Sequence, residues 1–140
     1  MRYYAVIDTN VFVSALLKWD SVPGNVAAQV LTGSIIPLLN DVIMAEYRDV
    51  LGRAKFHFPK EAVEVFLQGI ADRGIYVDTG STEYVLPDPK DAVFYEVVME
   101  ARKKQDSYLV TGNIKHFPVR TFVVTPREML NIIEHSEGGN

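Results

Sequence analysis

Short apolar runs alternate with longer amphipathic stretches along the whole chain. The short runs contain no regular polar positions, and they predict strands at Ala5–Ile7, Ile35–Leu39, Ile75–Val77, Tyr108–Thr111 and Phe122–Val124. Unbroken apolar runs of this length suit strands that are covered on both faces, as in parallel sheets. The alternation therefore predicts an α/β fold with five strands in a parallel sheet.

The amphipathic stretches predict the helices between these strands. Apolar residues recur at helical spacing in six stretches, which are 10–18, 26–33, 42–53, 59–74, 89–103 and a last stretch that starts after Thr125. A loop around Ser21–Gly24 is expected to separate the first two helices. The last helix should start with a capping box, because Thr125 is followed by Pro126 and Glu128. Residues 1–135 are expected to form one domain, and residues 136–140 a disordered tail.

The amino-acid composition excludes several classes of function. A chain of 140 residues is long enough for one sizeable core, and the lack of cysteine excludes disulfides, a thiol nucleophile and thiolate zinc sites. No apolar run approaches the roughly 18 residues that a membrane span needs, so we expect a cytoplasmic protein that does not bind membranes. The net charge of −4 disfavours unspecific attraction to nucleic acid, so a nucleic-acid substrate would require cations.

A carboxylate ends the first predicted strand. Asp8 follows Ala5–Ile7 directly, and the crevice beyond the carboxyl ends of parallel strands is where ligands bind in open α/β sheets. Thr9 and Asn10 follow as residues that favour a helix start. The alternative is that Asp8 only caps this helix, so it needs partners to form a site.

Glu46 is a second candidate because of its place on a predicted helix. With about 100° per residue and Val42 at zero, Glu46 falls near 40°, within the apolar face that includes Ile43 and Tyr47. A carboxylate among apolar neighbours needs a cation or a hydrogen bond. The alternative is that Glu46 lies at the rim of this face and reaches water or an arginine.

Asp91 lies near the start of the fifth predicted helix. The first turn of this helix can open toward the same sheet edge as Asp8. Alternatively, Asp91 could close a capping box in that turn. Asp88 could be the cap of this helix or an accessory acid. The segment from Thr111 to Phe117 places Thr111 and Asn113 at another carboxyl end, where Asn113 could also simply form a turn. His116 is interpreted as an ordinary loop residue.

Taken together, Asp8-Thr9-Asn10, the helical Glu46, the stretch Asp88–Phe94 and the stretch Leu109–Phe117 resemble the PIN-domain ribonucleases. The resemblance extends from Tyr4 to about Ile133, and the group that it favours contains toxins of toxin–antitoxin systems. It implies a three-layer α/β/α sandwich and a cluster of acids that binds Mg²⁺ or Mn²⁺ for hydrolysis of RNA. By position, the metal ligands would be Asp8, Glu46 and Asp91, and the fourth acid of the family is replaced by Asn113.

Elementary electrostatics is consistent with this assignment. Three acids that meet at one sheet edge raise each other's pKa unless a cation lies among them, and hard divalent ions prefer oxygen ligands. We therefore expect a metal-dependent endoribonuclease in which Asp8, Glu46, Asp91 and Asn113 form the catalytic site. Asn10, Asp88 and Thr111 would add secondary polar contacts. The expected partners are RNA, an antitoxin protein and a second copy of the chain.

Two other functions compete with this hypothesis. One is a catalytically weak PIN module that binds RNA or a protein partner, which the replacement by Asn113 favours. The other is a phosphatase of the haloacid-dehalogenase type, which would need an acid where this chain has Asn10.

Overall fold

The computed structural model describes residues 2–79, 86 and 89–138. Its strands are β1 (Tyr3–Ile7), β2 (Ile35–Leu39), β3 (Ile75–Tyr76), β4 (Ser107–Val110) and β5 (Val123–Val124). Its α-helices are α1 (Thr9–Leu17), α2 (Val22–Leu31), α3 (Asp41–Leu51), α4 (Lys60–Arg73), α5 (Ala92–Ala101) and α6 (Pro126–Gly138). Three short 3-10 helices join them, η1 (Ala54–Phe56), η2 (Pro89–Asp91) and η3 (Ile114–His116).

The strands form one parallel sheet in the order β3-β2-β1-β4-β5. β1 lies in the middle, where Tyr3 pairs with Ile35 of β2 and Ile7 pairs with Val110 of β4. The chain builds one half of the sheet outward from β1 and then returns to the other side of β1. The gap between β1 and β4 is therefore the point where the strand order reverses, which is the usual ligand position in such sheets.

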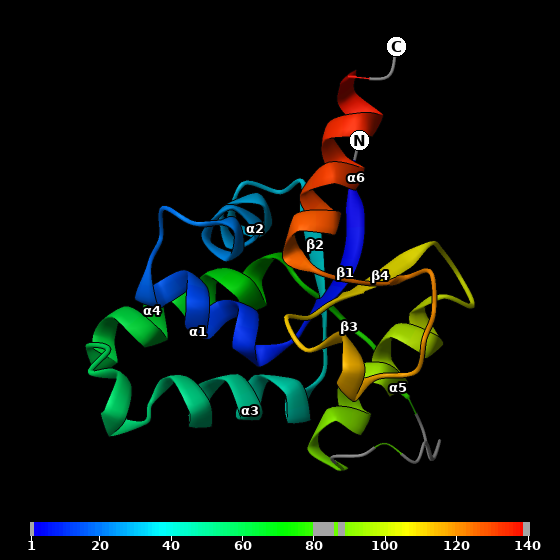
Figure 1. Cartoon of the computed structure of the whole chain (residues 1–140). Helices are drawn as coiled ribbons and strands as arrows, with labels where there is room; N and C mark the ends of the chain where they lie inside the picture. The colour runs from blue at the N-terminus through cyan, green and yellow to red at the C-terminus, as the bar shows by residue number, and fades with distance from the viewer. Residues whose placement is uncertain (1, 80–85, 87–88, 139–140) are drawn as a thin grey trace.

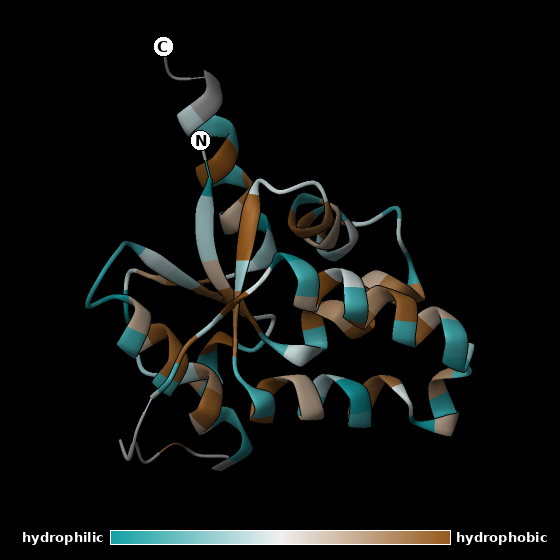
Figure 2. Ribbon diagram, turned by 180° about the vertical axis from the view of Figure 1, so that it is seen from behind, coloured by the Kyte–Doolittle hydropathy of each residue, from teal (hydrophilic) through white to brown (hydrophobic). Residues whose placement is uncertain are grey.

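Helices cover both faces of this sheet. Figure 1 shows α5 on one side of the strands and α1, α2 and α4 on the other, which confirms the predicted three-layer α/β fold. Apolar segments recur along the strands and helices in Figure 2, and β1 is buried at Ala5, Val6 and Ile7. The unbroken apolar strand that the sequence contains thus reflects burial on both faces.

The loop predicted at Ser21–Gly24 lies a few residues earlier in the structure, because α1 ends at Leu17 and α2 begins at Val22. Ser21 is the N-cap of α2, and its hydroxyl oxygen accepts a hydrogen bond from the backbone N–H of Gly24 at 3.0 Å. Pro23 occupies the first turn of this helix, where a proline is well tolerated. The serine and the proline were signals of a helix start rather than of a chain break.

The ends of the later helices agree partly with the sequence. The capping box of α6 is confirmed, because the N–H of Thr125 donates to Glu128 and the N–H of Glu128 donates to Thr125. α6 extends to Gly138, which is three residues into the segment predicted as a disordered tail. The predicted helix at 89–103 instead starts as η2 and continues as the shorter α5. None of the helices in the described parts of the chain is long and apolar enough to cross a membrane.

Candidate active site at the carboxyl edge of the sheet

Asp8 lies at the carboxyl end of the central strand. It directly follows β1, its backbone N–H donates to the carbonyl of Val110 at 2.9 Å, and its side chain is only 5% exposed. Although Asp8 occupies the N-cap position of α1, its side chain makes no capping hydrogen bond there. A purely structural role as a helix cap is therefore excluded, and the carboxylate is held beside β4 instead.

Burial dominates the electrostatics of this carboxylate. The pKa of Asp8 is raised from 3.8 to about 6, mainly because burial removes the hydration of the charged carboxylate, and the nearby charge of Asp91 contributes to this rise. Hydrogen bonds from Thr111 and the backbone at Thr9, together with the charge of His116, act in the opposite direction on this pKa. The site thus holds a carboxylate that an added positive charge would stabilise.

Thr111 connects Asp8 to the loop that follows β4. Its side chain is fully buried, and its hydroxyl donates to Oδ2 of Asp8 at 2.7 Å. The same hydroxyl oxygen accepts the backbone N–H of Asn113 at 2.9 Å. Thr111 therefore fixes both the Asp8 carboxylate and the start of the loop.

Asp91 reaches the same edge from the start of α5. It occupies the N-cap position of α5, where its side chain makes no capping hydrogen bond. The alternative of a capping box with Asp88 falls partly outside the described residues. Its Oδ2 lies 3.4 Å from Nδ1 of His116 in η3. The side chain of Asp91 is 15% exposed, whereas that of His116 is 52% exposed.

The place of His116 was not predicted from the sequence. A lone histidine in a loop carries no local sign of function, and its contact with Asp91 depends on how η3 folds back toward α5. The usable signal was its position three residues after Asn113, within the loop that leaves the carboxyl end of β4. His116 thus belongs to the same constellation of side chains as Asp8 and Asp91.

Glu46 does not lie within the apolar face of α3, where the sequence predicted it. The buried side of α3 consists of Ile43, Met44, Tyr47, Val50 and Leu51. At about 100° per residue this side is centred near 140° from Val42, so Glu46 lies about 100° away from its centre. Val42 is 60% exposed and Glu46 is partly exposed, which corrects the assumed apolar face. Glu46 is at the rim, as its alternative interpretation stated.

Tyr47, the neighbour of Glu46, is the residue of α3 that reaches the site. Its hydroxyl donates to the carbonyl oxygen of Ile7, the residue before Asp8. Burial raises the pKa of Tyr47 well above its usual value, and the charge of Asp8 raises it further. Tyr47 therefore remains a neutral hydrogen-bond donor that holds α3 against the end of β1.

Amide side chains flank Asp8 on its other side. Asn10 and Asn113 line one hollow of about 320 Å³ together with Ser14 and Gly112. This hollow is uncharged, and Asn10 is exposed beside it. Asn10, a predicted secondary contact, thus lies near Asn113, a predicted catalytic residue. Asp88 lies outside the described residues.

The donor chemistry of Asp8 and Asp91 fits a divalent cation. Both are carboxylates with hard oxygen atoms, and their mutual repulsion would be relieved by a cation between them. Mg²⁺ commonly binds one or two carboxylates and completes its coordination with water and substrate phosphate. Within residues 2–79, 86 and 89–138, no three His, Asp or Glu side chains lie close enough to hold a metal, so the predicted three-acid cluster is not preassembled there.

Comparison with known proteins adds one match. The family model described as PIN domain matches residues 4–115 of the 140, which include β1, α3, Asp91 and the loop at Asn113. The comparisons with curated proteins and with solved structures gave no match.

Proposed function

The chain belongs to the PIN domain family, whose members are generally nucleases, and on this premise we propose that it is a divalent-metal-dependent endoribonuclease. The observation that supports the proposal best is the buried Asp8 carboxylate beside Asp91 at the reversal point of the sheet. The reaction would be hydrolysis of RNA phosphodiester bonds. Its catalytic residues would be Asp8, Asp91, Glu46 and Asn113, with a different part for each.

Asp8 and Asp91 would hold the cation, which would be Mg²⁺ or Mn²⁺. When bound, such an ion activates water and neutralises the charge that develops on a phosphate. Thr111 would orient Asp8 through its hydrogen bond to Oδ2. Glu46 would be a further ligand that approaches from the rim of α3, and Asn113 would offer a neutral amide where the family pattern has an acid.

Lys115 would contribute to RNA binding at this edge. It lies in η3 next to His116, whose ring is beside Asp91. The arginine side chains near α3 are less suited to this role, because Arg48 pairs with Glu64 at 3.1 Å and Arg53 pairs with Asp49 at 3.2 Å. Positive charge at the site would therefore come mainly from the cation and from η3.

The proposal also extends to the biological role of the nuclease. The resemblance to toxins of toxin–antitoxin systems suggests that this nuclease is the toxin of such a pair, with an antitoxin as its protein partner. Growth arrest on expression of the wild-type chain, but not of Asp8→Asn, would support the toxin role. The cytoplasmic location and a homodimer stay predictions.

Cleavage of labelled single-stranded RNA by the purified protein tests the proposed reaction. We expect cleavage with Mg²⁺ or Mn²⁺ and none with a chelator. Asp8→Asn should reduce the rate at least about 100-fold, because the variant loses the charge that binds and orients the cation. Asp106→Asn is a matched control, since this exposed residue precedes β4 at the opposite edge of the sheet.

Two results would contradict the proposal. Equal cleavage by wild type and Asp8→Asn at saturating metal would mean that the assigned site does not carry out the reaction. RNA binding by the wild type without cleavage under any metal would instead favour a catalytically weak module that binds RNA.

A further inference from the structure

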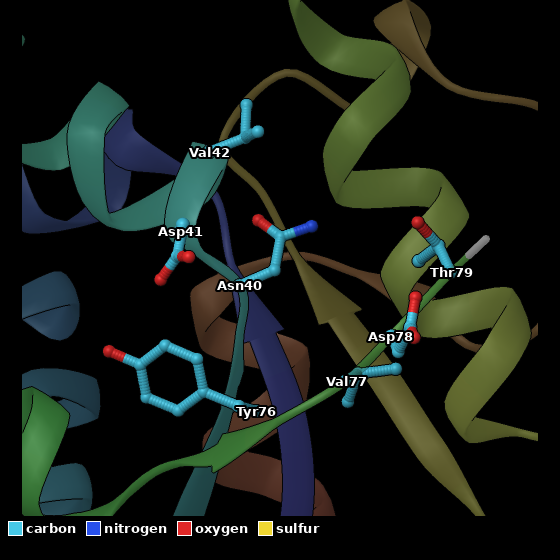
Figure 3. Close-up of a pocket in the computed structure, with 7 residues that line it drawn as sticks. All are labelled: Asn40, Asp41, Val42, Tyr76, Val77, Asp78 and Thr79. Carbon is cyan, nitrogen blue, oxygen red and sulfur yellow. The ribbon is translucent and has the colours of Figure 1, made fainter. Parts of the chain in front are cut away.

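A hollow beyond the ends of β2 and β3 is lined by polar side chains that do not face one ligand. Its volume is about 380 Å³, and Figure 3 shows its lining from the start of α3 and from the residues at and after the end of β3. The ring of Tyr76 lies on one side of the end of β2, whereas Asp78 and Thr79 lie on the other side. These groups therefore do not form a site for one small molecule.

A larger and mostly apolar hollow lies between α4 and the end of α2. Its volume is about 590 Å³. It is lined by Leu31 of α2 and by Ala62, Val65, Phe66 and Gly69 of α4, with Glu61 and Arg73 toward the two ends of that helix. We call this hollow the α4 groove. Its lining contains neither Asp8 nor Asp91, so a role for it is independent of the proposed nuclease reaction.

The α4 groove leaves apolar surface uncovered on a helix that is otherwise packed. One side of α4 is buried against the core, at Val63, Phe66, Leu67 and Ile70. Ala62, Val65 and Gly69 recur at helical spacing, so they lie along a second side of the helix, and Val65 is 74% exposed. An exposed apolar strip with charged residues at its ends is typical of a surface that another chain covers.

Glu61 and Arg73 give the two ends of the α4 groove opposite charges. They are separated along α4 by about 18 Å, at about 1.5 Å per residue. Arg73 is held beside the groove, because its Nε donates to the carbonyl of Leu31 at 2.7 Å and its Nη1 to that of Gly69 at 3.0 Å. A guanidinium has further N–H donors that can bind a carboxylate. A partner that fits must carry an apolar strip between two opposite charges in the reverse order.

The helix α4 itself has this pattern when its direction is reversed. We propose that the α4 groove binds α4 of a second copy of this chain, antiparallel and around a two-fold axis, so that the protein forms a homodimer. Such a contact is isologous, which means that each pairing occurs twice. With Glu61 opposite Arg73 of the second copy, Val65 comes opposite Gly69 of that copy.

Gly69 is suited to this contact because it has no side chain. A Cβ atom there would lie 3.2 Å from Cδ2 of Leu31, so the glycine keeps the groove open between α2 and α4. Val65 of the second copy would enter this space and cover Leu31. The dimer would thus bury both exposed valines, and the two ion pairs at its ends would set the antiparallel direction.

Sedimentation velocity over a wide range of protein concentration tests the dimer. The wild type should show a monomer–dimer equilibrium that shifts to the dimer as its concentration rises. Val65→Lys should weaken the dimer at least about 100-fold, because the new charge would be buried without a partner and close to Arg73 of the second copy. Val119→Lys is the matched control, since Val119 is an 89% exposed valine outside the groove, and it should associate as the wild type does.

A pair of charge reversals tests the antiparallel pairing itself. Glu61→Arg places two arginines opposite each other at both ends of the dimer, and Arg73→Glu places two glutamates there. Each variant alone should dimerise about tenfold more weakly than the wild type or worse. An equal mixture of the two should associate again, because in the mixed dimer each end joins opposite charges. A parallel arrangement of the helices would give no such rescue.

Arg73→Glu also loses two hydrogen bonds to the backbone, so its fold is checked by circular dichroism. If this variant does not fold, Val65→Lys and Glu61→Arg still decide the question. A wild type that stays monomeric up to its solubility limit would overturn the inference and leave the groove to a helix of another protein. A dimer that survives in Val65→Lys, or a mixture that associates no better than its components, would also overturn it.

Asp8→Asn separates this inference from the proposed function. The variant should cut no RNA and should dimerise as the wild type does, because Asp8 does not line the α4 groove. A wild type that dimerises without cutting RNA would remove the nuclease function and leave the dimer standing.

Discussion

At the scale of single residues, the burial of Asp8 has a direct consequence for stability. Its pKa is about 6 in the folded chain and close to 3.8 when hydrated, so between these pH values the folded state binds more protons than the unfolded state. The free energy of unfolding should therefore fall as the pH rises from about 4 to 6, by about 3 kcal/mol in total. Asp8→Asn should remove this loss and be the more stable protein at pH 7.5 without metal.

Urea denaturation of both proteins between pH 4 and pH 8 in the presence of a chelator measures this difference. Asp106→Asn controls for a change of net charge at an exposed position. If Asp8→Asn is less stable than the wild type at pH 7.5, another charge in the folded protein already compensates for the burial of the Asp8 carboxylate.

The candidate site was predictable from the sequence to different degrees at different residues. Asp8 lies at the end of β1 and Thr111 directly after β4, so the rule for carboxyl edges was sufficient to place both at one edge of the sheet. Glu46 was misplaced because the apolar face of α3 was drawn too wide, whereas the buried side is centred on Tyr47. His116 could be placed near this edge by its position in the loop after β4, but its contact with Asp91 is formed only by the tertiary fold.

At the scale of elements, the join between α1 and α2 depends on the lack of a side chain at Gly24. A Cβ atom there would lie 1.8 Å from the carbonyl oxygen of Trp19, so the backbone of the connection would have to move. Gly24→Ala should lower the free energy of unfolding by about 1–3 kcal/mol, as overpacking commonly does. Gly112→Ala is the control, because a Cβ at Gly112 meets no atom within 4 Å.

Urea denaturation at one pH compares these two variants with the wild type. A Gly24→Ala protein as stable as Gly112→Ala would contradict the close approach of Gly24 to Trp19.

Gly24 also explains why a loop was predicted at Ser21–Gly24. A glycine near a proline favours a loop by composition, whereas in this chain it permits tight contact between the start of a helix and the preceding turn.

At the scale of the whole molecule, the order of the strands decides which side chains meet. The sequence predicts five parallel strands, but it does not reveal that β4 lies beside β1, and this pairing brings Thr111 against Asp8. The strand order reverses there, next to the acids, which is the usual ligand position in such sheets. A chain with a net charge of −4 can thus act on RNA if cations supply the missing positive charge at this position.

The most direct test of this account is to locate the cation. Crystals soaked in Mn²⁺, at the concentration that supports RNA cleavage, would be examined for anomalous scattering. The account predicts a peak bonded to the carboxylates of Asp8 and Asp91, and no such peak in Asp8→Asn. A soaked crystal with no peak at this edge, or with a peak only beside Asp41 and Asp78, would contradict the proposed metal site.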